Sequence, residues 1–141
     1  MAKRVVKYDP DLTFNVITAL AVAEGELVGL NDLGTGSLAD GNGTQGNAVA
    51  DKAIGVAVKA AASGKMVAVA PICVVDGLSG LTKGALIYLG TTAGAYTQTK
   101  TSTNGETLQV VGIALSATKA LINVQAAQKF QTAGNSTLTS Y

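Results

Sequence analysis

The sequence predicts an all-β protein, a small compact β-barrel or sandwich, on three observations. First, eight short apolar runs follow one another at a spacing of roughly ten residues. Second, Gly, Asn, Asp, Ser and Thr separate these runs, as turn residues do between antiparallel strands. Third, the second half of the chain repeats the pattern of the first half. Regularly spaced short strands of this kind are typical of sandwiches and barrels.

The eight runs are the expected strands. In chain order they are residues 12–20, 26–30, 53–60, 65–75, 85–89, 95–99, 107–115 and 120–125. Asn104 and Gly105 mark the sharpest turn, since both residues tolerate the positive φ angles of a tight hairpin. We therefore expect a hairpin turn immediately before the seventh run.

A helix competes with a strand in one segment, residues 48–63, which is rich in Ala, the best helix former. Gly55 interrupts this segment, and Ile54, Val56 and Val58 alternate with smaller residues. Alternation with a period of two residues is the pattern of a strand with one buried face. The sequence therefore favours a strand here.

Two pairs of segments indicate a degenerate tandem duplication. Residues 22–32 ("VAEGELVGLND") match residues 80–90 ("GLTKGALIYLG"), because in both a turn glycine precedes a short apolar run. Residues 54–57 and 111–114 share the form apolar-Gly-apolar-Ala. Two copies are too few for a solenoid, so we expect them to close onto one compact core.

The duplication divides the chain into three parts. A single all-β domain is expected at 17–125, made of two related halves at about 20–76 and 77–125. An extended N-terminal arm at 1–16 precedes it, and a polar C-terminal tail at 126–141 follows it. Within the first half, the glycine-rich segment 31–51 is expected to be an exposed, mobile loop.

The composition argues against nucleic-acid and membrane binding. The formal net charge is +1 and only 4% of residues are aromatic, so the chain has neither the field nor the stacking surface that a nucleic acid requires. No uncharged apolar stretch reaches about 18 residues, and Lys7, Asp9 and Asp11 interrupt the start of the chain, where a signal peptide would be apolar. We therefore expect no nucleic-acid partner and no membrane insertion.

No set of residues predicts an enzyme, a cofactor site or a metal site. The sequence has no His, and its nine acidic residues lack metal-ligand spacing. Residues 41–46 match the letters of a dinucleotide-binding motif, but a loop precedes them and no acid lies between Asp51 and Asp76. Residues 116–119 match a Ser/Lys nucleophile pair without the further motifs that such enzymes need. Cys73 is expected to be a small buried side chain.

The repeated pattern also resembles a known class of protein. Three segments of the second half resemble a motif that recurs in phage virion proteins: residues 77–90 ("GLSGLTKGALIYLG"), 97–99 ("TQT") and 108–124 ("LQVVGIALSATKALINV"). In the first half, residues 16–30 and 51–71 are similar to small capsid decoration, or cement, proteins. The resemblance spans about residues 14–125 and includes no active site.

This resemblance implies a structural protein of the virion that covers the outer surface of an icosahedral phage head. Such a protein binds the major capsid protein after the head expands, commonly as homotrimers at local three-fold positions, and stabilises the shell. The same motif also occurs in phage tail fibres, so the alternative is a receptor-binding or spacer module of a fibre. Neither interpretation implies a cofactor.

Residues 2–16 are the candidate capsid-binding arm under this resemblance. Their basic side chains could pair with acidic capsid groups, and their apolar residues could add a strand to a capsid sheet. The candidate residues are Lys3, Arg4, Val5, Val6, Lys7, Tyr8 and Phe14. Pro10 is expected to end such a strand. The competing interpretation is an ordinary terminus followed by a first core strand near Leu12.

Overall fold

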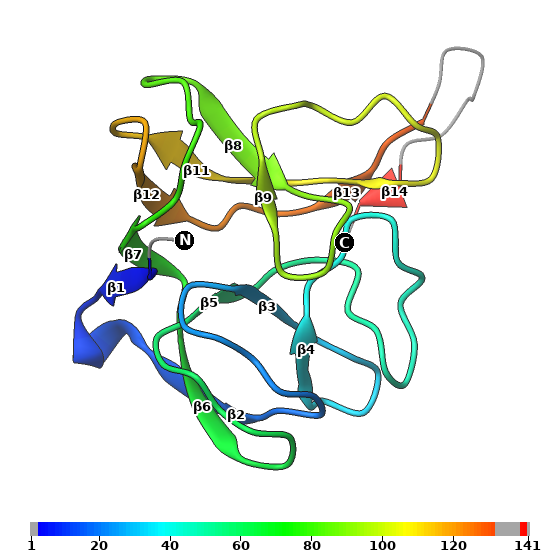
Figure 1. Ribbon diagram of the computed structural model, residues 1–141. Coiled ribbons are helices and arrows are strands. Elements are labelled where there is room, and N and C mark those ends of the chain that lie inside the picture. Colours follow the sequence, from blue (N-terminus) through cyan, green and yellow to red (C-terminus); the bar gives the residue numbers. More distant parts are fainter. Residues whose placement is uncertain (1–2, 132–138, 141) are drawn as a thin grey trace.

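The fold is an all-β sandwich of antiparallel sheets (Figure 1). The structure is a computed structural model that describes residues 3–131 and 139–140. A six-stranded and a five-stranded sheet form its two main layers, and a small three-stranded sheet lies beside them. The all-β prediction is confirmed. The barrel alternative is wrong, because none of the three sheets closes into a barrel; a single isolated bridge, between Thr18 and Gly36, joins the edges of the five-stranded sheet.

The five-stranded sheet has the order β2-β6-β5-β3-β4. Its strands are β2 (Phe14–Ile17), β3 (Leu27–Leu30), β4 (Gly36–Leu38), β5 (Gly55–Ala57) and β6 (Met66–Ala70). It forms the lower layer in Figure 1. A short 3₁₀ helix, η1 (Pro10–Leu12), leads into β2.

The six-stranded sheet has the order β1-β7-β12-β11-β8-β9 and forms the upper layer. Its strands are β1 (Val5–Lys7), β7 (Ile72–Asp76), β8 (Leu86–Leu89), β9 (Tyr96–Thr97), β11 (Val110–Ala114) and β12 (Lys119–Asn123). The third sheet, in the order β10-β13-β14, consists of β10 (Thr107–Leu108), β13 (Gln128–Lys129) and β14 (Thr139–Ser140).

Each of the eight expected runs contains a strand. The alanine-rich segment forms β5, as predicted, and the described residues contain no α-helix. The run at 65–75 holds two strands, because Pro71 separates β6 from β7. Proline lacks the N–H that a sheet ladder needs, and at Pro71 the chain leaves one sheet and enters the other.

The predicted turn at Asn104 and Gly105 is present, but it does not join a hairpin. Gly105 adopts a φ of +88°, and the Glu106 N–H donates to the Thr103 carbonyl oxygen at 3.2 Å. The strand after the turn, β10, pairs with β13 near the C-terminus. The local sequence therefore gives the turn correctly and the strand pairing incorrectly.

The two main sheets share one connectivity. The strands β2, β3, β4, β5 and β6 are arranged in their sheet as β7, β8, β9, β11 and β12 are in theirs, with β1 added at one edge. Strand pairing places β7 in the second half. The two repeats therefore run over residues 14–70 and 72–123, whereas the sequence suggested a boundary near residue 76.

Equivalent turns begin the matching strands of the two repeats. Gly25 and Gly84 both have positive φ angles, +88° and +82°, which favour glycine. The Gly25 N–H donates to the Ala57 carbonyl oxygen at 2.9 Å, and the Gly84 N–H donates to that of Ala114 at 2.8 Å. The sequence match between the halves therefore corresponds to matching backbone hydrogen bonds.

The main core lies between the two large sheets. Leu27 and Val56 of the five-stranded sheet and Val75, Ile87 and Ile122 of the six-stranded sheet are almost fully enclosed there. A second, smaller cluster covers the opposite face of the five-stranded sheet. It consists of Val22, Val28, Ala57, Val67 and Val69.

The segment 31–51 is more ordered and more buried than the sequence suggested. It contains β4, and Ala39, Ala50 and Asp51 within it are buried. Asn31, also buried, donates to Thr35 Oγ1 at 2.6 Å. Other residues of this segment are exposed, among them Leu33, with 68% of its surface accessible.

The described part of the predicted C-terminal tail is docked on the domain. Strand β13 pairs with β10, and Lys129 Nζ lies 2.9 Å from a carboxylate oxygen of the buried Asp51. Residues 132–138 and 141 of that tail, like residues 1–2 of the predicted arm, lie outside the described residues. Among the described residues, no helix has the length and apolar character that crossing a membrane requires.

Candidate functional site

The N-terminal segment, predicted as an extended arm, lies against the sandwich. Strand β1 pairs antiparallel with β7, with Val5 opposite Asp76 and Lys7 opposite Val74. Val6 points into the core with 6% of its surface exposed, whereas Val5 is 45% exposed and Lys7 is also exposed. The backbone of this segment is therefore already paired within the chain. Beyond it, Pro10 lies in η1 after the strand has ended.

Two glycines allow this segment to approach the body closely. Gly77 has a φ of +92°, and a Cβ there would lie 2.9 Å from the Arg4 Cα and still closer to the Lys3 carbonyl oxygen. A Cβ on Gly25 would lie 2.9 Å from the Arg4 side chain. Any larger residue would push the segment away from the turns beneath it.

Arg4 packs over an aromatic ring that the second repeat supplies. Its guanidinium carbon lies 5.6 Å from the centre of the Tyr96 ring, within the range of a cation–π contact. The Tyr96 hydroxyl donates to the Gly25 carbonyl oxygen at 2.7 Å. Burial raises the pKa of Tyr96 above its ordinary value, so the hydroxyl stays protonated and remains a donor.

Two glutamates near β1 accept hydrogen bonds from backbone N–H groups. The Val6 N–H, on the outer side of β1, donates to Glu24 Oε2 at 3.0 Å. The Ala23 N–H donates to Glu26 Oε1 at 2.7 Å. Glu24 thus occupies the backbone donor that a further strand would use at this edge.

An open groove of about 720 Å³ runs beside the segment. Its walls are formed by Lys3, Arg4, Ala23, Glu24, Glu26, Lys59 and Ala60. Within residues 3–131 and 139–140, no ion pair forms with Lys3 or Lys59. Because the two carboxylates already accept backbone hydrogen bonds, the lysines are the groups left to bind an acidic partner.

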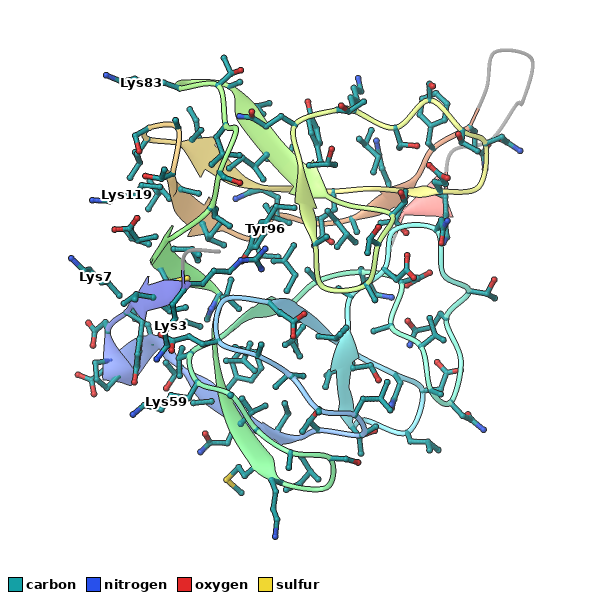
Figure 2. The ribbon with its side chains drawn as sticks, viewed as in Figure 1. Lys3, Lys7, Lys59, Lys83, Tyr96 and Lys119 are labelled. Atoms are coloured by element: carbon teal, nitrogen blue, oxygen red, sulfur yellow. The ribbon has the colours of Figure 1, made fainter. Side chains whose placement is uncertain are left out.

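The groove belongs to a larger basic edge, defined here as Lys3, Lys7, Lys59, Lys83 and Lys119. Figure 2 shows Lys7, Lys59, Lys83 and Lys119 pointing outward along the same side of the molecule. Lys119 lies 3.9 Å from Asp76, and both side chains are about 40% exposed. The sequence revealed only the N-terminal members of this edge, because the others come from distant parts of the chain.

The remaining predicted site residues, Tyr8 and Phe14, do not continue strand β1. Phe14 lies on β2 in the other main sheet, opposite Val69, and is 39% exposed. Tyr8 packs partly against the main core. The structure therefore brings Lys3, Arg4 and Lys7 together with new neighbours but does not extend β1 continuously to Phe14.

The described residues offer no arrangement for metal binding or thiol chemistry. No group of three or more His, Cys, Asp or Glu side chains among them could hold a metal ion. Cys73 is buried, and burial raises the pKa of its thiol to about 12. The thiol is thus protonated at ordinary pH, which makes it a poor nucleophile.

Tyr96→Phe is expected to lower the free energy of unfolding by about 1 kcal/mol, because it removes the hydrogen bond to Gly25 and keeps the ring beneath Arg4. Denaturant unfolding followed by circular dichroism measures this change. Tyr88→Phe is the matched control, since within the described part of the chain its hydroxyl has no hydrogen-bond partner. Equal effects of the two substitutions would contradict the role assigned to the Tyr96 hydroxyl.

No protein-family model matches the sequence, and no curated protein matches it significantly.

Proposed function

We propose that the protein is a structural component of a phage virion that decorates the outer surface of the head and stabilises it by binding the major capsid protein as a homotrimer. The proposal rests on the resemblance of the two repeats to capsid decoration proteins. The observation that favours it most is the basic edge, whose Lys3, Lys7 and Lys59 form no ion pair among the described residues. Acidic groups on a capsid surface would complement this edge.

The sandwich suits a protein whose role is to bind and reinforce. Its N-terminal segment is fixed by β1 pairing, by Arg4 over Tyr96 and by the close contact with Gly77. Lys3 and Lys7 are thus presented from an ordered strand region, which reduces the entropy that binding would otherwise cost. The edge acts as a preformed patch in this proposal.

Stabilisation of the shell follows from mass action. A protein that binds only the expanded shell stabilises it by RT ln(1 + [L]/Kd) at each site. At a free concentration of about 100 times Kd, this amounts to roughly 2.7 kcal/mol per site. Because a shell repeats the site many times, modest binding at each one would strengthen the whole head.

The proposal is tested by co-sedimentation with expanded, undecorated heads of the source phage. The variant carries Lys3→Glu, Lys7→Glu and Lys59→Glu, which reverse exposed charges without removing a strand. Deleting residues 2–16 would be a poor test, because it removes β1 and most of β2. The control is Lys100→Glu, an exposed lysine outside the basic edge.

Saturable binding by the wild type and the control, lost in the triple variant, is the expected result. Binding should also weaken as salt rises, because salt screens contacts between exposed charges. A wild-type protein that stays in the supernatant at micromolar concentration would overturn head binding and favour the tail-fibre alternative. If the triple variant binds as well as the wild type, the basic edge is not the contact.

A further inference from the structure

The first repeat buries a row of apolar side chains that runs across three strands. Leu27 of β3 lies opposite Val56 of β5, and Val56 lies opposite Ala70 of β6. Residues in register on neighbouring strands point to the same face. All three are 0% exposed, and all three belong to the core between the main sheets.

The second repeat contains the equivalent row on its outer face. Leu86 of β8 lies opposite Ile113 of β11, and Ile113 lies opposite Leu121 of β12. Leu86 follows the turn glycine Gly84 by two residues, just as Leu27 follows Gly25. Here, however, Leu86 is 46% exposed, Leu121 is 38% exposed and Ile113 is only partly buried.

The difference arises because the two repeats do not pack through equivalent faces. The second repeat covers the buried row of the first with its opposite face, which carries Ile87, Ala114 and Ala120. In the first repeat, the positions equivalent to these three are Val28, Ala57 and Val69, and the loop residue Val22 covers them. The stack therefore ends at the outer row of the second repeat, which the described chain leaves partly exposed.

The outer face is largely apolar along this row, which ends at Lys7 of the basic edge, opposite Val74 on β1. Val74 extends the row, since it lies opposite Leu121 on β7, and Ile72 on the same strand is 46% exposed. The charged residues Asp76 and Lys119 lie opposite each other and are 3.9 Å apart, so their charges cancel locally. A contiguous apolar face of this kind is typical of an interaction surface.

We propose that this outer face, defined by Val74, Leu86, Ile113 and Leu121, is the surface through which the protein associates with a second copy of itself. A second copy carries the same exposed row, so contact between the rows of two copies would remove Leu86 and Leu121 of both from water. The Asp76–Lys119 pair has both signs, which a second copy can complement. The inference names the surface for the self-association included in the proposed function.

The test is the mass of the purified protein, measured by sedimentation equilibrium without phage heads. The wild type is expected to form oligomers at micromolar concentration, and Leu121→Glu is expected to weaken association by at least about 100-fold, because it buries a charge at the contact. Leu33→Glu is the control, since Leu33 is 68% exposed and lies outside the face. A second variant, Leu86→Gln, tests the same face with a smaller change.

Oligomers of the wild type and of Leu33→Glu, with monomers of Leu121→Glu and Leu86→Gln, would support the surface. Far-ultraviolet circular dichroism checks that both variants remain folded. A wild type that is monomeric at every concentration would overturn the inference, even if it bound heads. Variants that remain folded and keep the wild-type mass would also overturn it. Neither result depends on head binding, so the proposed function fails or stands separately.

Discussion

Gln109→Ala is expected to lower the free energy of unfolding by about 3 kcal/mol, because it leaves several buried backbone groups without their hydrogen-bond partners. Gln109 is 2% exposed, and its Oε1 accepts from the Ala53 N–H at 2.8 Å. Its Nε2 donates to the carbonyl oxygens of Ala53, at 2.8 Å, and Gln125, at 2.9 Å. One side chain therefore joins the first repeat to two segments of the second half.

The matched control is Gln98→Ala. Gln98 makes the same kind of contacts, accepting from the Thr82 N–H at 2.7 Å and donating to the carbonyl oxygens of Thr82 and Ala85 at 3.0 and 3.3 Å. These contacts are largely exposed, so water can replace them and the loss should stay below about 1 kcal/mol. Guanidinium unfolding followed by far-ultraviolet circular dichroism compares the two. Similar losses would show that burial does not decide the effect.

Gly112→Ala is expected to cost at least about 3 kcal/mol, because the added methyl group has no room between β11 and β12. A Cβ at Gly112 would overlap the Leu121 carbonyl oxygen and lie 3.1 Å from the Ile122 Cα. These atoms belong to the neighbouring strand and cannot move aside without breaking the sheet. Both the denaturation midpoint and the yield of soluble protein should fall.

Gly46→Ala is the control for the glycine-to-alanine change. A Cβ there would meet only the Thr44 carbonyl oxygen at 3.7 Å, an ordinary contact, and the φ of Gly46 is not positive. Its stability should therefore stay within about 0.5 kcal/mol of the wild type. A Gly112→Ala protein as stable as this control would mean that β11 and β12 can separate at little cost.

Local sequence predicted the strands because their signals are local. Each apolar run is bounded by turn residues, and the glycines at 25 and 84 mark turns with the same backbone geometry. The match between 54–57 and 111–114 also predicted equivalent strands, β5 and β11. Fold class and repetition are thus encoded within short windows of the chain.

Features that depend on distant contacts were not predictable in the same way. The docking of β1 requires β7, about seventy residues later, and no local pattern announces that pairing. No local pattern announces the hydrogen bond of Glu24 either, because its partner, the Val6 N–H, comes from another strand. The burial of Asp51 similarly depends on Lys129. In each case the hydrogen-bonding or charged partner comes from a distant part of the chain.

The candidate site was predicted only in part for the same reason. Lys3, Arg4 and Lys7 are neighbours in the sequence, so their basic character is visible there. Lys59, Lys83 and Lys119 reach the same side of the molecule from distant parts of both repeats. Their gathering is a property of the topology rather than of any segment.

The order of the two repeats along the chain also sets the order in which the two main sheets can form during translation. Residues 14–70 can pair all their strands before residues 72–123 leave the ribosome. Until then Leu27, Val56 and Ala70 face water, since the sheet that covers them has not been made. Strand β1, the first to be synthesised, also waits for β7. The nascent first repeat therefore exposes apolar surface, which makes aggregation easiest at this stage of synthesis.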